Sequence, residues 1–189
     1  MTREEKQMLG LLSFLMMYPN DDYWRSLEAF EPSTAALPAG DATNCITAFL
    51  AYLESQPRIV LQENYTAAFD MNPSTTLNLT YHLWGDNENR ADALVRLEQV
   101  YRDAGYERTS GELPDCLPLM LEFLSICPDA RGVEHLWACL RELDAYLIRL
   151  EREAPAYAAL LQPLARMASS RTPNKTNALQ AQVPAPPRR

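Results

Sequence analysis

The sequence predicts an all-α protein, a single-domain bundle of about seven to eight helices followed by a disordered C-terminal tail. The length of 189 residues suits one domain. Hydrophobic residues make up 47% and charged residues 22%, with a mean hydropathy of -0.28, as in soluble globular proteins. Apolar residues recur at helical spacing along most of the chain. Residues 77–83 alternate as a strand does, but no other segment could pair with them, so we expect a short helix or an extended loop there.

Helical periodicity is clearest near the two ends of the chain. Apolar residues from Met8 to Met16 form one stripe, which Pro19 stops. Leucines between positions 136 and 150 repeat at spacings of 4, 3, 4 and 3, the strongest periodicity in the sequence. We expect further helices at 20–28, 46–53, 57–69, 94–105, 114–124 and 160–167, with a loop at 32–41.

The charge distribution divides the chain into an acidic body and a basic end. Residues 1–168 are expected to form the helical domain, and 169–189 a flexible, proline-rich basic tail. Residues 1–170 hold 13 basic and 25 acidic side chains, whereas no acidic residue follows Glu153. An acidic body repels nucleic acid and anionic lipid surfaces. The sequence therefore predicts no nucleic-acid partner and favours a cationic peptide or protein segment.

Cysteine usage and the N-terminus both predict a cytoplasmic protein. Cys45, Cys116, Cys127 and Cys139 show no C-x-x-C spacing, and nothing else suggests a secreted disulfide framework. The apolar run at 8–18 follows two acidic residues and lacks a cleavage site, so we interpret it as a mature helix rather than a signal peptide. No apolar run reaches the ~18 residues that span a bilayer, so direct membrane insertion is not expected.

The sequence offers little material for catalysis. Only His82 and His135 could serve as a general base, and no G-x-S-x-G motif is present. A zinc site would need cysteine and histidine from separate segments. We expect no catalytic residue, metal site or cofactor. Two alternatives stay open: a helical metal-binding enzyme or sensor that uses His82, Cys116 and carboxylates, and a helical adaptor subunit.

Residues 112–124, with the sequence ELPDCLPLMLEFL, stand out by composition. They contain two prolines and three carboxylates in thirteen positions. A helix start accounts for each residue singly, since proline and acidic residues favour the first turn. It does not explain a second proline four residues after the first. The segment is therefore a candidate functional site.

This segment resembles the E-L-P-D-(H/Y)-L-P-L-x-L-E-(F/Y)-L signature of the NarJ-type chaperones, the nitrate reductase molybdenum cofactor assembly proteins also called delta subunits. Residues 65–70 resemble the family's Y-x-x-x-F-D, and residues 77–86 its L-x-L-x-x-H-(V/L)-x-G-(D/E) segment. The helix ending in Tyr18-Pro19 is similar to the L-x-x-Y-P opening. Cys116 and Trp84 depart from the pattern, because histidine is common at both positions. The resemblance covers about residues 8–125 in the same order.

The resemblance implies an all-helical chaperone without catalytic activity, within the wider TorD/DmsD-like group of redox enzyme maturation proteins. Such proteins bind the N-terminal leader of the catalytic alpha subunit of nitrate reductase. They hold this subunit until its molybdenum cofactor and iron–sulfur centre are inserted, before membrane docking. Molybdenum cofactor biosynthesis proteins are further candidate partners.

A leader with basic residues and an apolar face suits helix-in-groove binding, with an acidic rim that orients it. Methionines such as Met16, Met17 and Met120 would let the groove repack around a client. For the aromatic residues and His82, lining the groove and belonging to the core remain equally open. The candidate peptide-binding residues are Glu112, Pro114, Asp115, Pro118, Glu122, Tyr65, Phe69, Asp70, His82 and Trp84.

Overall fold

The computed structural model describes residues 1–34, 40–109 and 111–171, and every regular element within these ranges is helical. An isolated antiparallel bridge joins Asn78 to Cys116. The all-α prediction is therefore confirmed. The elements are α1 (Arg3–Leu15), α2 (Asp21–Thr34), α3 (Asp41–Ser55), α4 (Arg58–Tyr65), the π-helix η1 (Thr66–Asp70), α5 (Leu79–Trp84), α6 (Glu88–Asp103), α7 (Leu117–Ile126), α8 (Val133–Cys139), the 3₁₀-helix η2 (Leu140–Glu142), α9 (Leu143–Glu153) and α10 (Pro155–Arg171).

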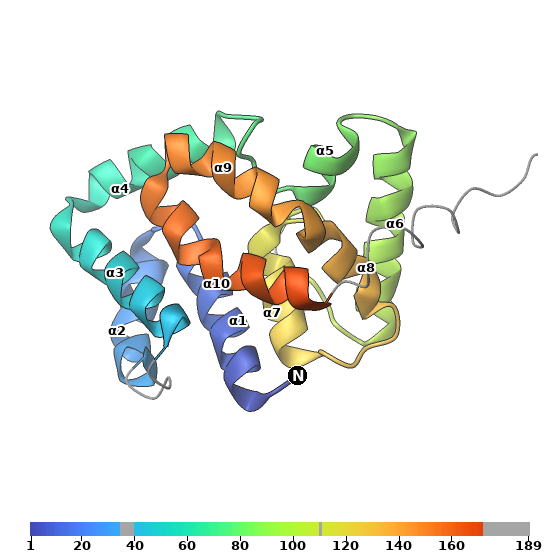
Figure 1. Cartoon of the computed structure of the whole chain (residues 1–189), viewed down its shortest axis with the longest axis horizontal. Helices are drawn as coiled ribbons and strands as arrows, with labels where there is room; N and C mark the ends of the chain where they lie inside the picture. The colour runs from blue at the N-terminus through green and yellow to red at the C-terminus, as the bar shows by residue number, and fades with distance from the viewer. Residues whose placement is uncertain (35–39, 110, 172–189) are drawn as a thin grey trace, which may run out of the picture.

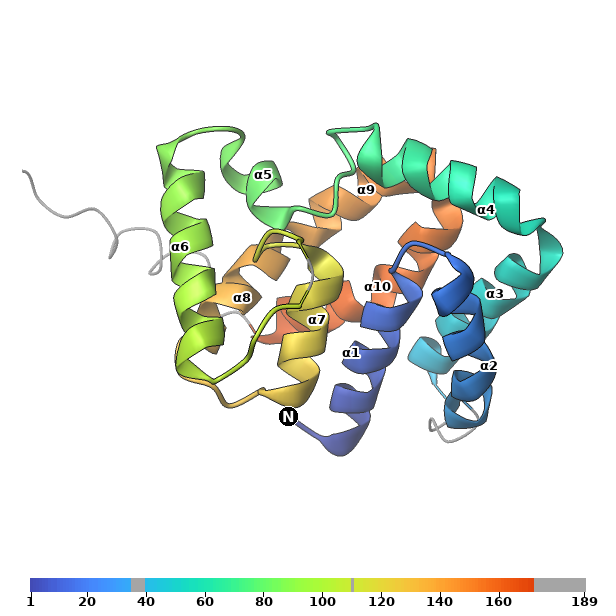
Figure 2. The ribbon, with the colours of Figure 1, turned by 180° about the vertical axis from the view of Figure 1, so that it is seen from behind.

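The centre of the fold is the pair formed by α1 and α7, which pack side by side along their lengths (Figures 1 and 2). Helix α10 packs against α3 and α9, and helices α2, α3 and α4 gather at one end of the molecule. Helices α5, α6 and α8 form the other end. Six of the ten side chains of α7 are buried, as expected for a central helix. No helix in the described ranges is long and apolar enough to cross a membrane.

A capping box starts α1 several residues before the predicted stripe. The hydroxyl of Thr2 accepts a hydrogen bond from the Glu5 backbone N–H at 3.1 Å, and the Glu5 carboxylate accepts one from the Thr2 N–H at 2.8 Å. Glu5 also pairs with Arg171 of α10 at 2.6 Å. The hydrogen bond from Arg171 holds the pKa of Glu5 below its usual value. This contact ties the first helix to the last.

Two helical segments have different boundaries in the structure from those that the sequence predicted. The leucine repeat at 136–150 does not form one continuous α-helix, because the 3₁₀ turn η2 separates α8 from α9, while Leu140 stays buried. Helix α7 begins at Leu117 rather than at Pro114, since the Leu117 N–H donates to the Leu77 carbonyl at 2.9 Å. Pro118 then lies in the first helical turn, where proline is tolerated as predicted.

Two predicted loop or tail regions are shorter than expected. Helix α2 continues through Pro32 to Thr34, inside the expected loop, and residues 35–39 lie outside the described residues. Helix α10 extends to Arg171, so residues 169–171 belong to the helical domain rather than to the tail. Arg171 is anchored there because its guanidinium lies 4.9 Å from the ring centre of Trp137. The flexible tail stays a prediction, since 172–189 lie outside the described residues.

Candidate functional site

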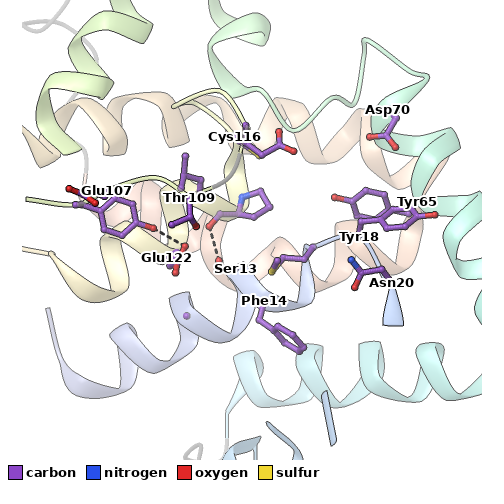
Figure 3. Close-up of a pocket in the computed structure, with 16 residues that line it drawn as sticks. Ser13, Phe14, Tyr18, Asn20, Tyr65, Asp70, Glu107, Thr109, Cys116 and Glu122 are labelled. Atoms are coloured by element: carbon purple, nitrogen blue, oxygen red, sulfur yellow. Dashed lines mark hydrogen bonds between the residues drawn. The ribbon is translucent and has the colours of Figure 1, made fainter. Parts of the chain in front are cut away.

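An open groove of about 870 Å³ lies between the end of α1, the end of α4 with η1, and the segment that leads into α7 (Figure 3). Three parts of the chain, far apart in sequence, form its walls. The lining residues are Gly10, Ser13, Phe14, Met17, Tyr18 and Asn20 from the first part, Tyr65 and Asp70 from the second, and Tyr106, Glu107, Thr109, Glu112, Cys116, Pro118, Leu119 and Glu122 from the third.

The first wall is the turn after α1, which presents apolar side chains to solvent. Met17 is 52% exposed and Tyr18 is 41% exposed. The Tyr65 hydroxyl donates a hydrogen bond to the Met16 carbonyl at 3.1 Å, and this bond fixes the end of α1 against α4. Tyr18 packs edge-on against the Tyr65 ring, with 5.4 Å between ring centres. The wall therefore combines an anchored backbone with exposed side chains.

The second wall depends on the π-helical turn η1. The Met71 N–H donates to the Thr66 carbonyl at 2.9 Å, which is the i→i+5 pattern. Phe69 points into the core, where its ring centre lies 5.0 Å from that of Tyr157, while Asp70 is exposed at the groove. Single π-turns are frequent at functional sites because the extra residue redirects the side chains that follow.

Two hydrogen bonds fix the third wall, one within the wall itself and one to α1. Gly105, at φ 69°, ends the α6 region in a left-handed conformation, and Tyr106 follows it. The Tyr106 hydroxyl donates to a Glu122 carboxylate oxygen at 2.7 Å. The Ser13 hydroxyl donates to the Pro118 carbonyl at 2.7 Å and joins α1 to α7 beside the groove.

Exposed carboxylates set the charge of the groove. None of its described lining residues is lysine, arginine or histidine. Arg108, which lies between the lining residues Glu107 and Thr109 in the sequence, forms an ion pair with Glu98 at 2.7 Å. Figure 3 shows Asp70 at one end of the groove, and Glu107 and Glu122 at the opposite end. The four acidic lining residues are Asp70, Glu107, Glu112 and Glu122, all exposed.

Cys116 lines the groove, but its thiol is not activated. Burial, and secondarily the charge of Glu112, raises the pKa of Cys116 to about 12, so the thiol stays protonated near neutral pH. The thiolate is the form that attacks substrates and binds metals. Across the described ranges, no three His, Cys, Asp or Glu side chains gather as a metal site would require. The geometry gives no support to the metal-binding alternative with His82 and Cys116.

Asp115, predicted among the peptide-binding residues, lies in the interior of the protein rather than at the groove surface. Its side chain is fully buried, and it accepts hydrogen bonds from the Asn78 side-chain amide at 3.1 Å and the Thr80 backbone N–H at 3.0 Å. The Thr80 hydroxyl donates to the same carboxylate. Asp115 therefore joins segment 77–86 to segment 112–124 and satisfies an N–H at the start of α5.

Three other predicted residues have structural surroundings away from the groove. Pro114 is buried, and its carbonyl accepts a hydrogen bond from the Tyr101 hydroxyl at 2.7 Å. The Nε2 atom of His82 lies 2.8 Å from the Thr76 carbonyl, which can only accept, so Nε2 carries the proton. Burial lowers the pKa of His82. Trp84 is 36% exposed on α5 and does not line the groove.

The structure thus divides the ten predicted residues into two groups. Those that line the groove are Tyr65, Asp70, Glu112, Pro118 and Glu122. Those outside its lining are Phe69, His82, Trp84, Pro114 and Asp115. Whether any of the ten binds a peptide stays a prediction.

The sequence analysis missed part of the groove. Tyr106 and Glu107 follow the glycine that ends the α6 region. An aromatic and an acidic residue side by side in a loop could have marked them as candidate binding residues. Among the methionines expected to repack, Met17 lines the groove, while Met16 and Met120 are fully buried. Only Met17 therefore has room to adapt to a ligand.

Comparison with known proteins places this geometry among relatives. A model of the family described as nitrate reductase delta subunit matches residues 35–152. The nitrate reductase molybdenum cofactor assembly chaperone NarJ of Escherichia coli is 33% identical over 165 residues, which cover 86% of this chain and 70% of NarJ. A Bacillus subtilis protein named as a probable chaperone of the same kind is 30% identical over 166 residues, covering 86% of this chain and 89% of that protein.

A solved structure shares the fold. The crystal structure of a candidate redox enzyme maturation protein from Archaeoglobus fulgidus matches with a TM-score of 0.59. The match covers 86% of this chain and 92% of that chain, at 19% sequence identity. At this identity the likeness concerns the helical architecture alone.

Proposed function

The chain belongs to the nitrate reductase delta subunit family of assembly chaperones, and we propose that its groove binds the N-terminal leader of a nitrate reductase catalytic subunit. The protein acts as a chaperone rather than as an enzyme. It holds the client in the cytoplasm before the molybdenum cofactor is inserted. Molybdenum cofactor biosynthesis proteins, which act on the held client, are the second class of partner in this proposal.

The observation that carries the proposal is the arrangement of charge and apolar surface in the groove. Asp70 lies at one end and Glu107 and Glu122 lie at the other, while Met17 and Pro118 are among the apolar lining. A peptide with basic residues on both sides of an apolar stretch matches this pattern. The apolar stretch gains by leaving water, and the charges orient the peptide and speed its association.

Release of the client is as important as its capture. The carboxylates of the groove are exposed, so their attraction for a cationic peptide is screened by solvent and by salt. Such rim charges affect the rate of association and the orientation more than the final affinity. The groove is therefore suited to a reversible complex, which a chaperone needs.

A calorimetric titration tests the proposal. A synthetic peptide that covers the N-terminal region of the nitrate reductase catalytic subunit is expected to bind the full chain with 1:1 stoichiometry. The double variant Asp70→Lys/Glu107→Lys reverses one charge at each end, at side chains that have no hydrogen-bond or ion-pair partner among the described residues. We expect binding to weaken about five- to thirtyfold, which corresponds to about 1–2 kcal/mol for two partly screened contacts.

The matched control is Asp92→Lys/Glu151→Lys, which changes the net charge equally at exposed positions outside the groove. It should retain most of the wild-type affinity, and raising NaCl from about 0.05 M to about 0.5 M should weaken the wild type more than the groove variant. If the folded wild type gave no binding, the leader would not be its ligand. Equal affinities for the two double variants would place the peptide elsewhere.

A further inference from the structure

The last residues of the sequence carry the same charge pattern that the groove is suited to bind. Lys175 lies near one end of residues 172–189, and Arg188 and Arg189 lie at the other. The segment contains no aspartate or glutamate, and its largest apolar side chains, Leu179 and Val183, stand between the basic residues. Basic, apolar and basic regions thus follow one another, as acidic, apolar and acidic regions do in the groove.

We propose that the segment 172–189 occupies the groove of its own molecule until a client displaces it. The groove holds four exposed carboxylates and no cationic side chain among its described lining residues, and the segment supplies three cationic side chains and no acidic one. Opposite potentials attract a tethered segment as they attract a free partner. The consequence for the client rests on the proposed function, because the segment and the leader then compete for one groove.

The attachment point of the segment is compatible with this occupancy. The described part of α10 ends at Arg171, which pairs with Glu5 at 2.6 Å on α1, the helix that also provides Gly10 and Ser13 to the groove. From Glu5 to Gly10 the distance along the helix axis is about 7 Å, at 1.5 Å per residue. A fully extended chain of the length of 172–189 spans at most about 60 Å. The segment therefore has up to about 60 Å to cover the path from Arg171, past α1, to the groove.

Tethering makes a weak contact effective. A short flexible connection gives the tethered segment an effective concentration on the order of millimolar. A segment that binds with a Kd of about 1 mM would then fill the groove about half of the time. The exposed Met17 and Tyr18 would be covered when no client is present, which limits unspecific apolar contacts. The client would still displace the segment. The apparent affinity of the client falls only in proportion to the fraction of molecules whose groove is open.

The test uses the full chain with Lys175→Glu/Arg188→Glu/Arg189→Glu, called the tail variant. Its control is Arg96→Glu/Arg131→Glu/Arg152→Glu, which changes the net charge equally at exposed positions outside the groove. Both variants gain the same general attraction for a cationic peptide. We expect the leader peptide to bind the tail variant about two- to tenfold more tightly than the control variant.

A second titration examines the segment directly. A synthetic peptide of residues 172–189 is expected to bind the tail variant. Adding Asp70→Lys/Glu107→Lys to the tail variant should abolish this binding, because it reverses one charge at each end of the groove.

Each outcome separates this proposal from the proposed function. Equal leader affinities in the tail and control variants, or no binding of the 172–189 peptide, would overturn the occupancy and leave leader binding intact. Binding of the 172–189 peptide without any binding of the leader would reject the leader as client and retain the occupancy. A concentration-dependent dimer in sedimentation that disappears in the tail variant would show that the segment binds a second copy, which contradicts occupancy within one molecule.

Discussion

Replacing Asp115 by alanine should destabilise the fold rather than abolish peptide binding directly. The change leaves three donors without their acceptor: the backbone N–H and the hydroxyl of Thr80, which is fully buried, and the half-buried Asn78 amide. A buried donor that loses its partner costs about 1–3 kcal/mol. The two buried donors of Thr80 and a small cavity give an expected loss of about 3–5 kcal/mol in the free energy of unfolding. Urea denaturation followed by circular dichroism measures it.

Asp115→Asn should cost less, about 1–2 kcal/mol, because the amide oxygen can still accept from Thr80 while its NH₂ group faces Asn78. Asp92→Ala, at an exposed position on α6, is the control and should change the stability by less than about 0.5 kcal/mol. The folded fraction of Asp115→Ala should bind the leader peptide as the wild type does. A variant of normal stability that has lost peptide binding would refute this reasoning and return Asp115 to the client-facing surface.

Two further predictions concern the fold outside the groove. Gly132→Ala should lower the free energy of unfolding by about 1–3 kcal/mol in urea denaturation, because φ is 83° there and a Cβ atom would lie 2.7 Å from a methyl group of Val100; unchanged stability would contradict the strained position. Burial lowers the pKa of His82 below its usual 6.5, so the unfolded chain takes up the proton first and stability is lost as the pH falls below that value. Between about pH 7.5 and about pH 5.5 the wild type should therefore lose more stability than His82→Gln, whose amide can still donate to Thr76 but does not titrate. Parallel pH profiles of the two proteins would contradict it.

Much of the fold was predictable because helical periodicity is a local property. The stripe from Met8 to Met16 lies in α1 and the following turn, and the stop at Pro19 separates α1 from α2. The boundaries that differed depend on contacts with distant segments. Leu117 begins α7 because its N–H is paired with Leu77, forty positions earlier, and no local pattern contains that information.

The site was predicted only in part, for the same reason. Asp115 and Glu112 lie in one motif and look equivalent in sequence, yet one is fully buried and the other is exposed in the groove. The difference comes from Asn78 and Thr80, which supply the donors that Asp115 needs in the interior. Composition showed that the motif is unusual for a helix start. Which of its carboxylates are buried and which are exposed depends on contacts that exist only in the folded chain.

The walls of the groove differ in how they can respond to a ligand. Asp115 holds one wall from inside, while the Pro118 carbonyl is bonded to Ser13, so this wall is rigid and lies on the central helix pair. The facing turn carries Met17, whose side chain is half exposed and, being unbranched, of a type that adapts easily to a neighbour. In the proposed complex, the carboxylates of Glu112 and Glu122 on the rigid wall would orient the ligand, and the exposed side chain of Met17 would adapt to its apolar part. If the groove binds a leader as proposed, adaptation at one wall would let leaders of different sequence bind, and the rigid wall would keep their direction the same.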